Sequence, residues 1–543
     1  MWQKIWHKLA TTVAGGAIII ASASIFSRLL GLVRDRLLAS RFGAGDVLDT
    51  YYAAFKIPDF VFNVLVLGAL SSAFIPIFVE YLHRDKDNET KKNEAWYLSN
   101  SILNILLIGL FIIGGLFFVF AHQLVPLISP GFSPEKQIIT IKLTRIMLIA
   151  IIFFGASNIA SGILNSFKRY LSFAFAPVMY NTGIIFGIIA LTPRYGVYGL
   201  AYGVVLGAIM HLLIQLPGII KVGYRYKNIL DFKHEGVRKI AKLMVPRAFG
   251  LAVNQVDQMI SLIIGTTLAA GSVAVFNLAN NLQSFPINVF GVSLAIAAFP
   301  VFSEAFAQKD MTKFVVQFST SFRRVLFLII PTSVLILLLR AQIVRVILGT
   351  GAFNWEDTYL TAQTLAFFSL SLFAQSLIPM LARCFYAFHD TKTPVKIGIV
   401  AVIIDIAGAL TLTKIMPDPV TGLALAFSIS SIVNMLLLLI LIRRKLGYFD
   451  DKKIIKSFVK IVIASILMGG IVWLSKYIIA QGVNMQTFIG IFIQGILAGI
   501  VGIFAYLIIA VIFRMDEIKI ITEWIFKTKK QIVNGQENNH ESK

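Results

Sequence analysis

Long apolar stretches separated by short polar breaks run through most of the chain, and they constrain its fold more than any other feature. A helix that crosses a bilayer needs ~20 mostly apolar residues, and about fourteen such stretches recur between residues 13 and 513. The chain is 57% hydrophobic and only 14% charged, whereas soluble proteins are ~45–50% apolar and ~25% charged. The sequence therefore predicts an all-α polytopic membrane protein of about fourteen transmembrane helices.

Basic residues gather in alternate breaks. Lys and Arg are scarce in the odd breaks, such as 122–136 and 481–485, and frequent in the even ones, such as 221–239 and 443–453. Cytoplasmic loops of membrane proteins carry this excess of positive charge. The pattern predicts a multi-pass protein of the bacterial cytoplasmic (inner) membrane with both termini in the cytoplasm. It also assigns the net charge of +22 to contacts with anionic membrane lipids, not nucleic acid.

The sequence repeats itself once at an offset of 217 to 224 residues, for example in 73–80 and 297–304. Each copy spans six predicted helices, and an even number gives the two copies the same orientation in the membrane. We expect two parallel six-helix lobes at 1–222 and 223–445, two further helices in 446–513, and a cytoplasmic tail at 514–543. The residues after about 530 are polar and are expected to be disordered. Two-lobed carriers bind their substrate between the lobes.

Ionisable and polar residues within the first two predicted helices are candidates for substrate binding, because such groups are costly in a bilayer and usually face a cavity or a partner. The candidates are Arg28, Arg34, Asp49, Lys56, Asp59 and Asn63. Lys56, Asp59 and Asn63 share one helical face. Alternatively, Arg34 pairs with Asp35 near the interface, and the polar stripe forms interhelical hydrogen bonds.

The second repeat offers further candidates. Asn277, Asn281, Ser284 and Asn288 form a stripe on the eighth predicted helix, and Arg247 and Arg383 lie in the seventh and tenth. Arginine binds diphosphates through paired donors, so these residues indicate an anionic head group. The alternatives are interhelical hydrogen bonding for the stripe and an interfacial position for Arg383.

Two carboxylates at membrane depth, Asp257 and Asp405, together with Ser430 or Asn434 form a candidate cation site for Na⁺ or H⁺ coupling. Local hydrogen bonding without a transported ion is the alternative. No other cofactor is expected. The sequence has no HExxH, P-loop or CxxC motif, so we expect a transporter driven by a gradient or potential and not an enzyme.

Several motifs resemble one known family, the MurJ/MviN lipid II flippases. They are FSRLLGLVRD at 26–35, FGAG at 42–45, Asp49, AFKIP at 54–58, AFIP at 73–76, PGF at 130–132, FP at 285–286, FY at 385–386 and DTKTPVK at 390–396. The resemblance implies a fourteen-helix fold of the multidrug/oligosaccharidyl-lipid/polysaccharide exporter type, alternating access, and a cationic cavity for a diphosphate. It places Arg28, Arg34, Asp49 and Lys56 on motif positions, and Asp405 on a proposed sodium site.

The chain departs from the family pattern in its second and eighth predicted helices. Many members carry Arg-Arg where this chain has Phe62-Asn63, Ala-Glu-Gly where it has 66–68, and Asp-Arg where it has Asn280-Asn281. Salt bridges that the family forms at these positions cannot form here.

The expected function is outward translocation of lipid II, or of a similar polyprenyl-diphosphate sugar lipid, in peptidoglycan synthesis and cell-shape maintenance. Cell-wall synthesis enzymes are candidate partners. A polysaccharide-repeat flippase or a multidrug exporter of the same superfamily, a membrane-embedded glycosyltransferase and a non-transporting envelope scaffold are the alternatives.

Overall fold

The computed structural model of this chain describes residues 13–83 and 89–519, and every regular element in those ranges is a helix. The contacts divide the chain into two compact units. The N-terminal unit contains the residues up to Leu278 together with Ile347–Asp357, and the C-terminal unit contains Ala279–Val346 and the residues from Thr358 onward. Each unit is described separately below. The lobe boundaries expected from the repeat stay a prediction, as does disorder after residue 530, which lies outside the described residues.

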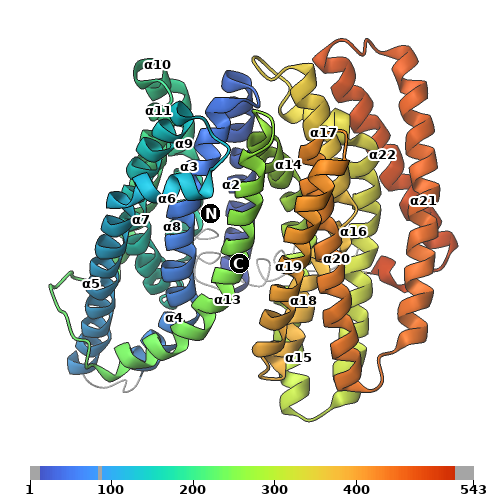
Figure 1. Cartoon of the computed structure of the whole chain (residues 1–543). Helices are drawn as coiled ribbons and strands as arrows, with labels where there is room; N and C mark the ends of the chain where they lie inside the picture. The colour runs from blue at the N-terminus through green and yellow to red at the C-terminus, as the bar shows by residue number, and fades with distance from the viewer. Residues whose placement is uncertain (1–12, 84–88, 520–543) are drawn as a thin grey trace, which may run out of the picture. The chain divides into compact units, whose positions relative to one another are not determined.

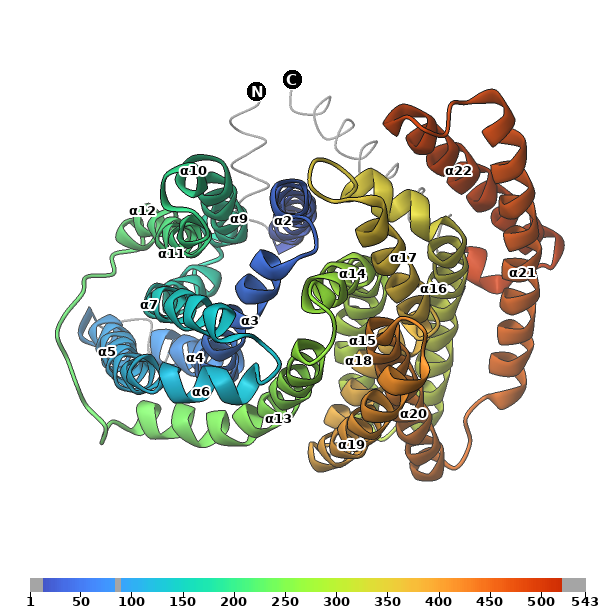
Figure 2. The same cartoon turned by 45° about the horizontal axis from the view of Figure 1, so that its top comes forward.

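Helices account for most of the N-terminal unit (Figures 1 and 2). In chain order they are α2 (Val13–Phe42), α3 (Asp46–Val61), the π-helical turn η1 (Phe62–Leu67), α4 (Gly68–His83), α5 (Glu89–Val119), α6 (Ala121–Ile128), α7 (Pro134–Ser166), α8 (Tyr170–Ala174), α9 (Ala176–Phe186), the π-helical turn η2 (Gly187–Leu191), α10 (Thr192–Tyr195), α11 (Tyr198–Leu213), α12 (Leu216–Lys221) and α13 (Glu235–Thr266).

The division between the units falls within α14 (Ser272–Pro286). The helices that follow are the π-helical turn η3 (Ile287–Val292), α15 (Ser293–Ala307), α16 (Met311–Ile347), α17 (Trp355–Ser369), α18 (Leu372–Ala387), α19 (Lys392–Ile415), α20 (Pro419–Leu446), α21 (Asp451–Gly482), α22 (Phe488–Ile512) and the 3₁₀ turn η4 (Asp516–Ile518).

Among the described residues, 11 helices are long and apolar enough to cross a membrane, and the bent pair α17–α18 brings this number to 12. The helix α2 and the run α3–η1–α4 are also long, but they contain the charged candidates and are not among those 12. The expected multi-pass, all-helical fold is therefore confirmed in its class.

The repeat is also seen in two helical runs that each contain a π-helical turn. In α3–η1–α4 a π-helical turn covers Phe62–Leu67, and in α14–η3–α15 another covers Ile287–Val292, which is close to the offset seen in the sequence. A proline follows in each run, Pro76 in α4 and Pro300 in α15. π-helical turns within α-helices are rare and often occur at functional sites.

The core of the N-terminal unit closes around aromatic rings from α4, α5 and the residue that ends α7. Phe78 packs 5.7 Å from Trp96, and Trp96 stacks on Phe167 at 5.6 Å between ring centroids.

The segment 222–234, which follows α12, lies along α5. Asn100 Oδ1 accepts hydrogen bonds from the hydroxyl of Tyr224 and from the backbone N–H of Lys227, both at 2.8 Å.

In each unit a serine contacts the segment that leads into a later helix, the segment before α13 in one unit and the segment before α21 in the other. In the N-terminal unit, Ser101 Oγ on α5 accepts from the backbone N–H of Asp231 at 3.0 Å, shortly before α13 begins. In the C-terminal unit, Ser319 on α16 donates to Asp450 Oδ2 at 2.9 Å, directly before α21 begins. Serines at equivalent positions of the repeat therefore contact the segments before α13 and α21, one by accepting from a backbone N–H and the other by donating to a carboxylate.

A buried ion pair fixes the end of the described chain to the C-terminal unit. Arg323 on α16 pairs with Glu517 in η4, and Ser457 on α21 donates to the same carboxylate at 2.9 Å. The Glu517 side chain is 4% exposed. Removing one partner of such a pair leaves a buried charge without compensation.

We expect Glu517→Ala to lower the free energy of unfolding by about 3–5 kcal/mol, because Arg323 stays buried without its carboxylate. The measurement is thermal unfolding of the purified protein in detergent. Glu304→Ala is the matched control, since Glu304 pairs with Lys313 at 2.9 Å but is 59% exposed, and exposed pairs contribute about 0–1 kcal/mol. Equal melting temperatures for the two variants would contradict the prediction.

Candidate functional site

The first candidate group surrounds Arg34 in α2. Its Nη2 lies 2.8 Å from Asp35 Oδ1, and its Nη1 donates to Asn181 Oδ1 of α9 at 3.2 Å. Asn181 in turn donates to the backbone oxygen of Ser27 at 3.2 Å. The pairing of Arg34 with Asp35 that the sequence offered as an alternative is thus present. The Arg34 side chain is 23% exposed.

Arg28 lies two helical turns before Asp35 on the same face of α2 and is half-buried. On α3, Lys56 donates to Gln258 Oε1 of α13 at 3.4 Å, and Asp59 follows one turn later. Asn63 is half-buried in η1. The polar stripe Lys56–Asp59–Asn63 thus ends where the helix widens into a π-helical turn.

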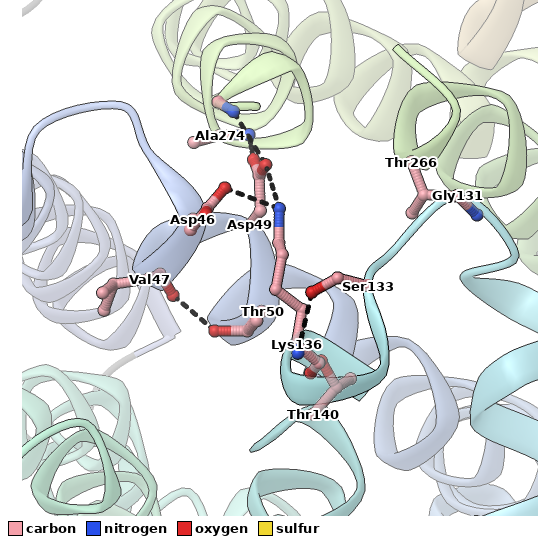
Figure 3. A network of polar contacts seen from close by, with 11 residues as sticks. Asp46, Val47, Asp49, Thr50, Gly131, Ser133, Lys136, Thr140, Thr266 and Ala274 are labelled. Carbon is pink, nitrogen blue, oxygen red and sulfur yellow. Dashed lines mark hydrogen bonds and ion pairs between the residues drawn. The ribbon is translucent and has the colours of Figure 1, made fainter. Parts of the chain in front are cut away.

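Asp49 is the most completely bonded of the predicted residues. It is 2% exposed and lies in the first turn of α3. Its Oδ2 accepts from the backbone N–H of Gly271 at 2.8 Å, and its Oδ1 accepts from that of Ala274 at 2.9 Å. Figure 3 shows the carboxylate pointing at the first turn of α14. The N–H groups at a helix start have no partner within their own helix and favour a negative charge, so Asp49 caps α14 from another helix.

Lys136 supports this carboxylate from α7. Its ammonium lies 2.7 Å from Asp46 Oδ1, 3.4 Å from Asp49 Oδ2 and 4.4 Å from the centroid of the Phe132 ring. Figure 3 shows dashed lines that join the lysine ammonium to both aspartates. The charge of Asp49 is therefore balanced by a cation and by the dipole of α14.

Close backbone approaches surround Asp49. Gly271 has a φ of 87°, and a Cβ there would collide with the backbone oxygen of Ala44. The backbone N–H of Ala44 donates to Asp357 Oδ2 at 3.1 Å, and that of Ala352 donates to Ser40 O at 2.7 Å. The end of α2, the starts of α3 and α14, and the segment before α17 therefore meet in one closely packed cluster, here called the α14 cap.

The other predicted head-group residues lie in several places. Asn281 lies in α14 within the C-terminal unit, and Arg383 in α18 donates to Pro379 O at 3.0 Å. The side chain of Arg247 lies outside the described residues. Asn277 and Asn288 donate to backbone oxygens of their own helical run at 2.8 and 2.7 Å.

The predicted cation site is divided between the two units. Asp257 is in α13 of the N-terminal unit, whereas Asp405 in α19 and Ser430 in α20 belong to the C-terminal unit. Asp405 is 4% exposed, and Ser430 donates to Ala401 O of α19 at 2.9 Å. Within the described residues, no group of three or more His, Cys, Asp or Glu side chains could hold a metal ion. The donors at Asp405 and Ser430 are a carboxylate and a hydroxyl, which suit a hard monovalent cation or a proton.

Three residues of the site were not predicted from the sequence: Lys136, Asn181 and Gln258. Lys136 stood out in the charge pattern as the one basic residue of its break, which is a signal that could have identified it. Asn181 and Gln258 lie in ordinary membrane helices, and only the fold brings them to Arg34 and Lys56.

We expect Asp49→Ala to increase hydrogen exchange at the amides of Gly271 and Ala274 in the purified full-length protein. Loss of a helix cap costs ~0.5–2 kcal/mol, which corresponds to exchange roughly 2- to 30-fold faster. Asp46→Ala is the control, because Asp46 is 59% exposed and shares only Lys136 with the cap. Unchanged exchange at both amides in Asp49→Ala would refute the role of Asp49 as a cap.

Comparison with known proteins identifies relatives along nearly the whole chain. The family model described as lipid II flippase MurJ matches residues 38–493. The lipid II flippase MurJ of Burkholderia cenocepacia is 28% identical over 462 residues, covering 84% of this chain and 88% of that protein. The probable lipid II flippase MurJ of Haemophilus influenzae is 29% identical over 491 residues, covering 86% and 94%.

Solved structures agree with these relatives. A structure of lipid II flippase MurJ in an inward closed conformation superposes with a TM-score of 0.75 at 28% identity, covering 92% of this chain and 100% of that one. An inward-facing multidrug transporter of the MATE family has a TM-score of 0.65 at 14% identity, covering 80% and 99%, and so shares the fold. Because the family model matches most of the sequence, this chain belongs to the lipid II flippase MurJ family.

Proposed function

We propose that this protein moves lipid II from the cytoplasmic to the outer leaflet of the bacterial inner membrane by alternating access. The family match over residues 38–493 carries the proposal. The groups on α2 and α3 support it, because Arg28, Arg34 and Lys56 offer cationic donors at membrane depth and a diphosphate needs such donors. Lipid II is thus the substrate partner, and cell-wall synthesis enzymes are candidate partners.

The proposed topology has fourteen spans. The 12 spans recognised by length and apolar composition become fourteen when α2 and α3–η1–α4 are added, and an even number keeps both termini in the cytoplasm. Two parallel lobes related by an axis along the membrane normal form the core, and α21 and α22 lie beyond them. The repeated π-helical turns and the repeated serine contacts of α5 and α16 support this division.

The membrane potential gives transport its direction in this proposal. Moving one charge through 100 mV corresponds to ~2.3 kcal/mol, and an inside-negative potential drives an anionic diphosphate outward. The same potential draws an empty cationic cavity back toward the cytoplasm. As part of the proposal, Na⁺ or H⁺ at Asp257, Asp405 and Ser430 couples this cycle to an ion gradient. The chain itself acts as a transporter without a catalytic step.

We expect Arg28→Ala to abolish outward exposure of lipid II in cells that depend on this protein, because the diphosphate loses a membrane-depth guanidinium. Exposure is measured with an added, membrane-impermeant enzyme that cleaves lipid II. Arg41→Ala is the matched control, since Arg41 on the same helix donates to Ile188 O at 2.8 Å and has no role in the proposal. Exposure that persists in Arg28→Ala at normal expression would favour the non-transporting scaffold.

We expect Asp405→Asn to make lipid II exposure insensitive to the sodium and proton gradients while the protein still inserts normally, because an amide cannot carry the proton or the full charge that binds a cation. The measurement is the same cleavage assay after each gradient is collapsed separately. If the parent protein is already insensitive to both gradients, the coupling proposal falls and the flippase proposal stands.

A further inference from the structure

A cavity of about 720 Å³ lies at one end of the C-terminal unit, where α15 ends, α16 begins and α18 ends. Phe299, Ser303 and Phe306 contribute from one face of α15, at a spacing of four and three residues. Lys309, Tyr386 and His389 complete the part of the lining used below. We call this cavity the aromatic vestibule. Its volume is within the ~300–1,000 Å³ that is usual for small-molecule sites.

The lining combines rings with hydrogen-bond donors. The side chain of Tyr386 is 41% exposed, so its ring can receive a ligand. Lys309 and His389 are the residues with positive φ, 57° and 58°, that follow α15 and α18, and both line the cavity. Mostly apolar walls with a few donors are typical of sites that orient a polar organic ligand.

The vestibule lies next to Arg383, which the sequence predicted to bind the head group of the substrate. Arg383 precedes Tyr386 by three residues on α18, so the two side chains lie on one face, within one turn of ~5.4 Å. The bond of Arg383 to Pro379 O at 3.0 Å uses one of the five N–H donors of a guanidinium. A phosphate at Arg383 would therefore leave the next group of the same ligand at Tyr386.

The aromatic lining is specific to the second repeat. When the two repeats are aligned by matching Pro76 with Pro300, Phe299, Ser303 and Phe306 of the second repeat fall on aliphatic residues of the first. Those residues are Ile75, Val79 and Leu82. Lys168 and His389 both have positive φ and are equivalent positions of the two repeats. Matching them aligns Tyr386 of the second repeat with Asn165 of the first. Phe299 and Tyr386 therefore have no aromatic counterpart in the first repeat, whereas Phe306 also has a packing role, with its ring centroid 5.3 Å from that of Phe388.

We propose that the aromatic vestibule binds the sugar–peptide part of the lipid II head group while Arg383 contacts the diphosphate. The C–H face of a pyranose ring stacks on Tyr386 or Phe299, and Lys309 and His389 donate to hydroxyl, amide or carboxylate oxygens. This inference rests on the proposed function. It assigns the binding of the sugar and peptide, for which the cationic residues of α2 and α3 offer no partner, to the C-terminal unit.

The charges at this end of the unit favour that occupant. Lys309 and Lys392 lie in or beside the breaks after α15 and α18, which the charge pattern predicts to be cytoplasmic. Lys313 nearby already pairs with Glu304 at 2.9 Å. The head group of lipid II enters from the cytoplasm and carries carboxylates. An acidic phospholipid has the charge but no sugar to stack, so the test below separates the two.

The experiment compares two ligands on the purified full-length protein in nanodiscs: lipid II, and undecaprenyl diphosphate, which has the same tail and diphosphate but no sugar or peptide. We expect Tyr386→Ala to weaken lipid II binding about tenfold, or ~1.4 kcal/mol, and to change undecaprenyl diphosphate binding less than about twofold. Lys309→Gln, at an exposed position after α15, is expected to show the same selectivity and guards against misfolding of the tyrosine variant.

Tyr448→Ala is the matched control, because Tyr448 is 67% exposed and follows α20 at the same end, where Lys445 pairs with Asp390 at 3.2 Å. It should leave both affinities unchanged. The inference is overturned if Tyr386→Ala and Lys309→Gln weaken both ligands equally or neither. It is also overturned if a vesicle phospholipid such as phosphatidylglycerol binds the parent protein but not these variants while lipid II binds all three alike. If the parent protein binds neither lipid II nor undecaprenyl diphosphate, the proposed function itself has failed.

Discussion

A buried charge and a free backbone N–H group at a helix end each need a partner inside the protein, because taking either out of water without one is costly. Asp49 satisfies both needs at once. Its carboxylate accepts the N–H groups of Gly271 and Ala274 at the start of α14, and Lys136 balances its charge. Breaking this contact would leave two helix N–H groups and a buried carboxylate without their partners at the same time. The α14 cap is thus a contact that the chain can open only when other groups replace it.

The same constraint applies at the positions where the resemblance implied paired charges and this chain has neutral residues. There the neutral side chains have neutral partners. Asn280 accepts from Gln283 at 2.9 Å, and Gln283 accepts from Gln375 at 3.0 Å. Phe62 packs against Phe154 at 5.3 Å between ring centroids. An amide network of this kind needs no counter-charge in a medium of low dielectric constant.

The sequence predicted those features that depend on local composition or on periodicity. Apolar length indicated the helices, and the offset of the repeat relates the two helical runs that contain the π-helical turns Phe62–Leu67 and Ile287–Val292. The turns themselves were not predicted, and the orientation indicated by the basic breaks stays a prediction. It could not predict that Asn181 would receive Arg34 or that Gln258 would receive Lys56, because those pairs are 147 and 202 residues apart. Gly271 is needed because its φ is 87° and because Ala44 O approaches it closely. A glycine at that position is consistent with a tight turn, but the sequence alone does not predict its contact with Ala44.

The two repeats share a frame but differ in chemistry, and this difference is where a carrier gains specificity. The contacts that hold the exit segments are similar, through Ser101 in one unit and Ser319 in the other, because both lobes must hold the helix that follows them. The N-terminal unit carries Arg28, Arg34 and Lys56 on α2 and α3, whereas the C-terminal unit carries rings and donors where α15 and α18 end. A diphosphate is recognised by charge and a sugar by shape and apolar faces. In the proposal, the cationic residues and the aromatic vestibule therefore recognise chemically different parts of the ligand.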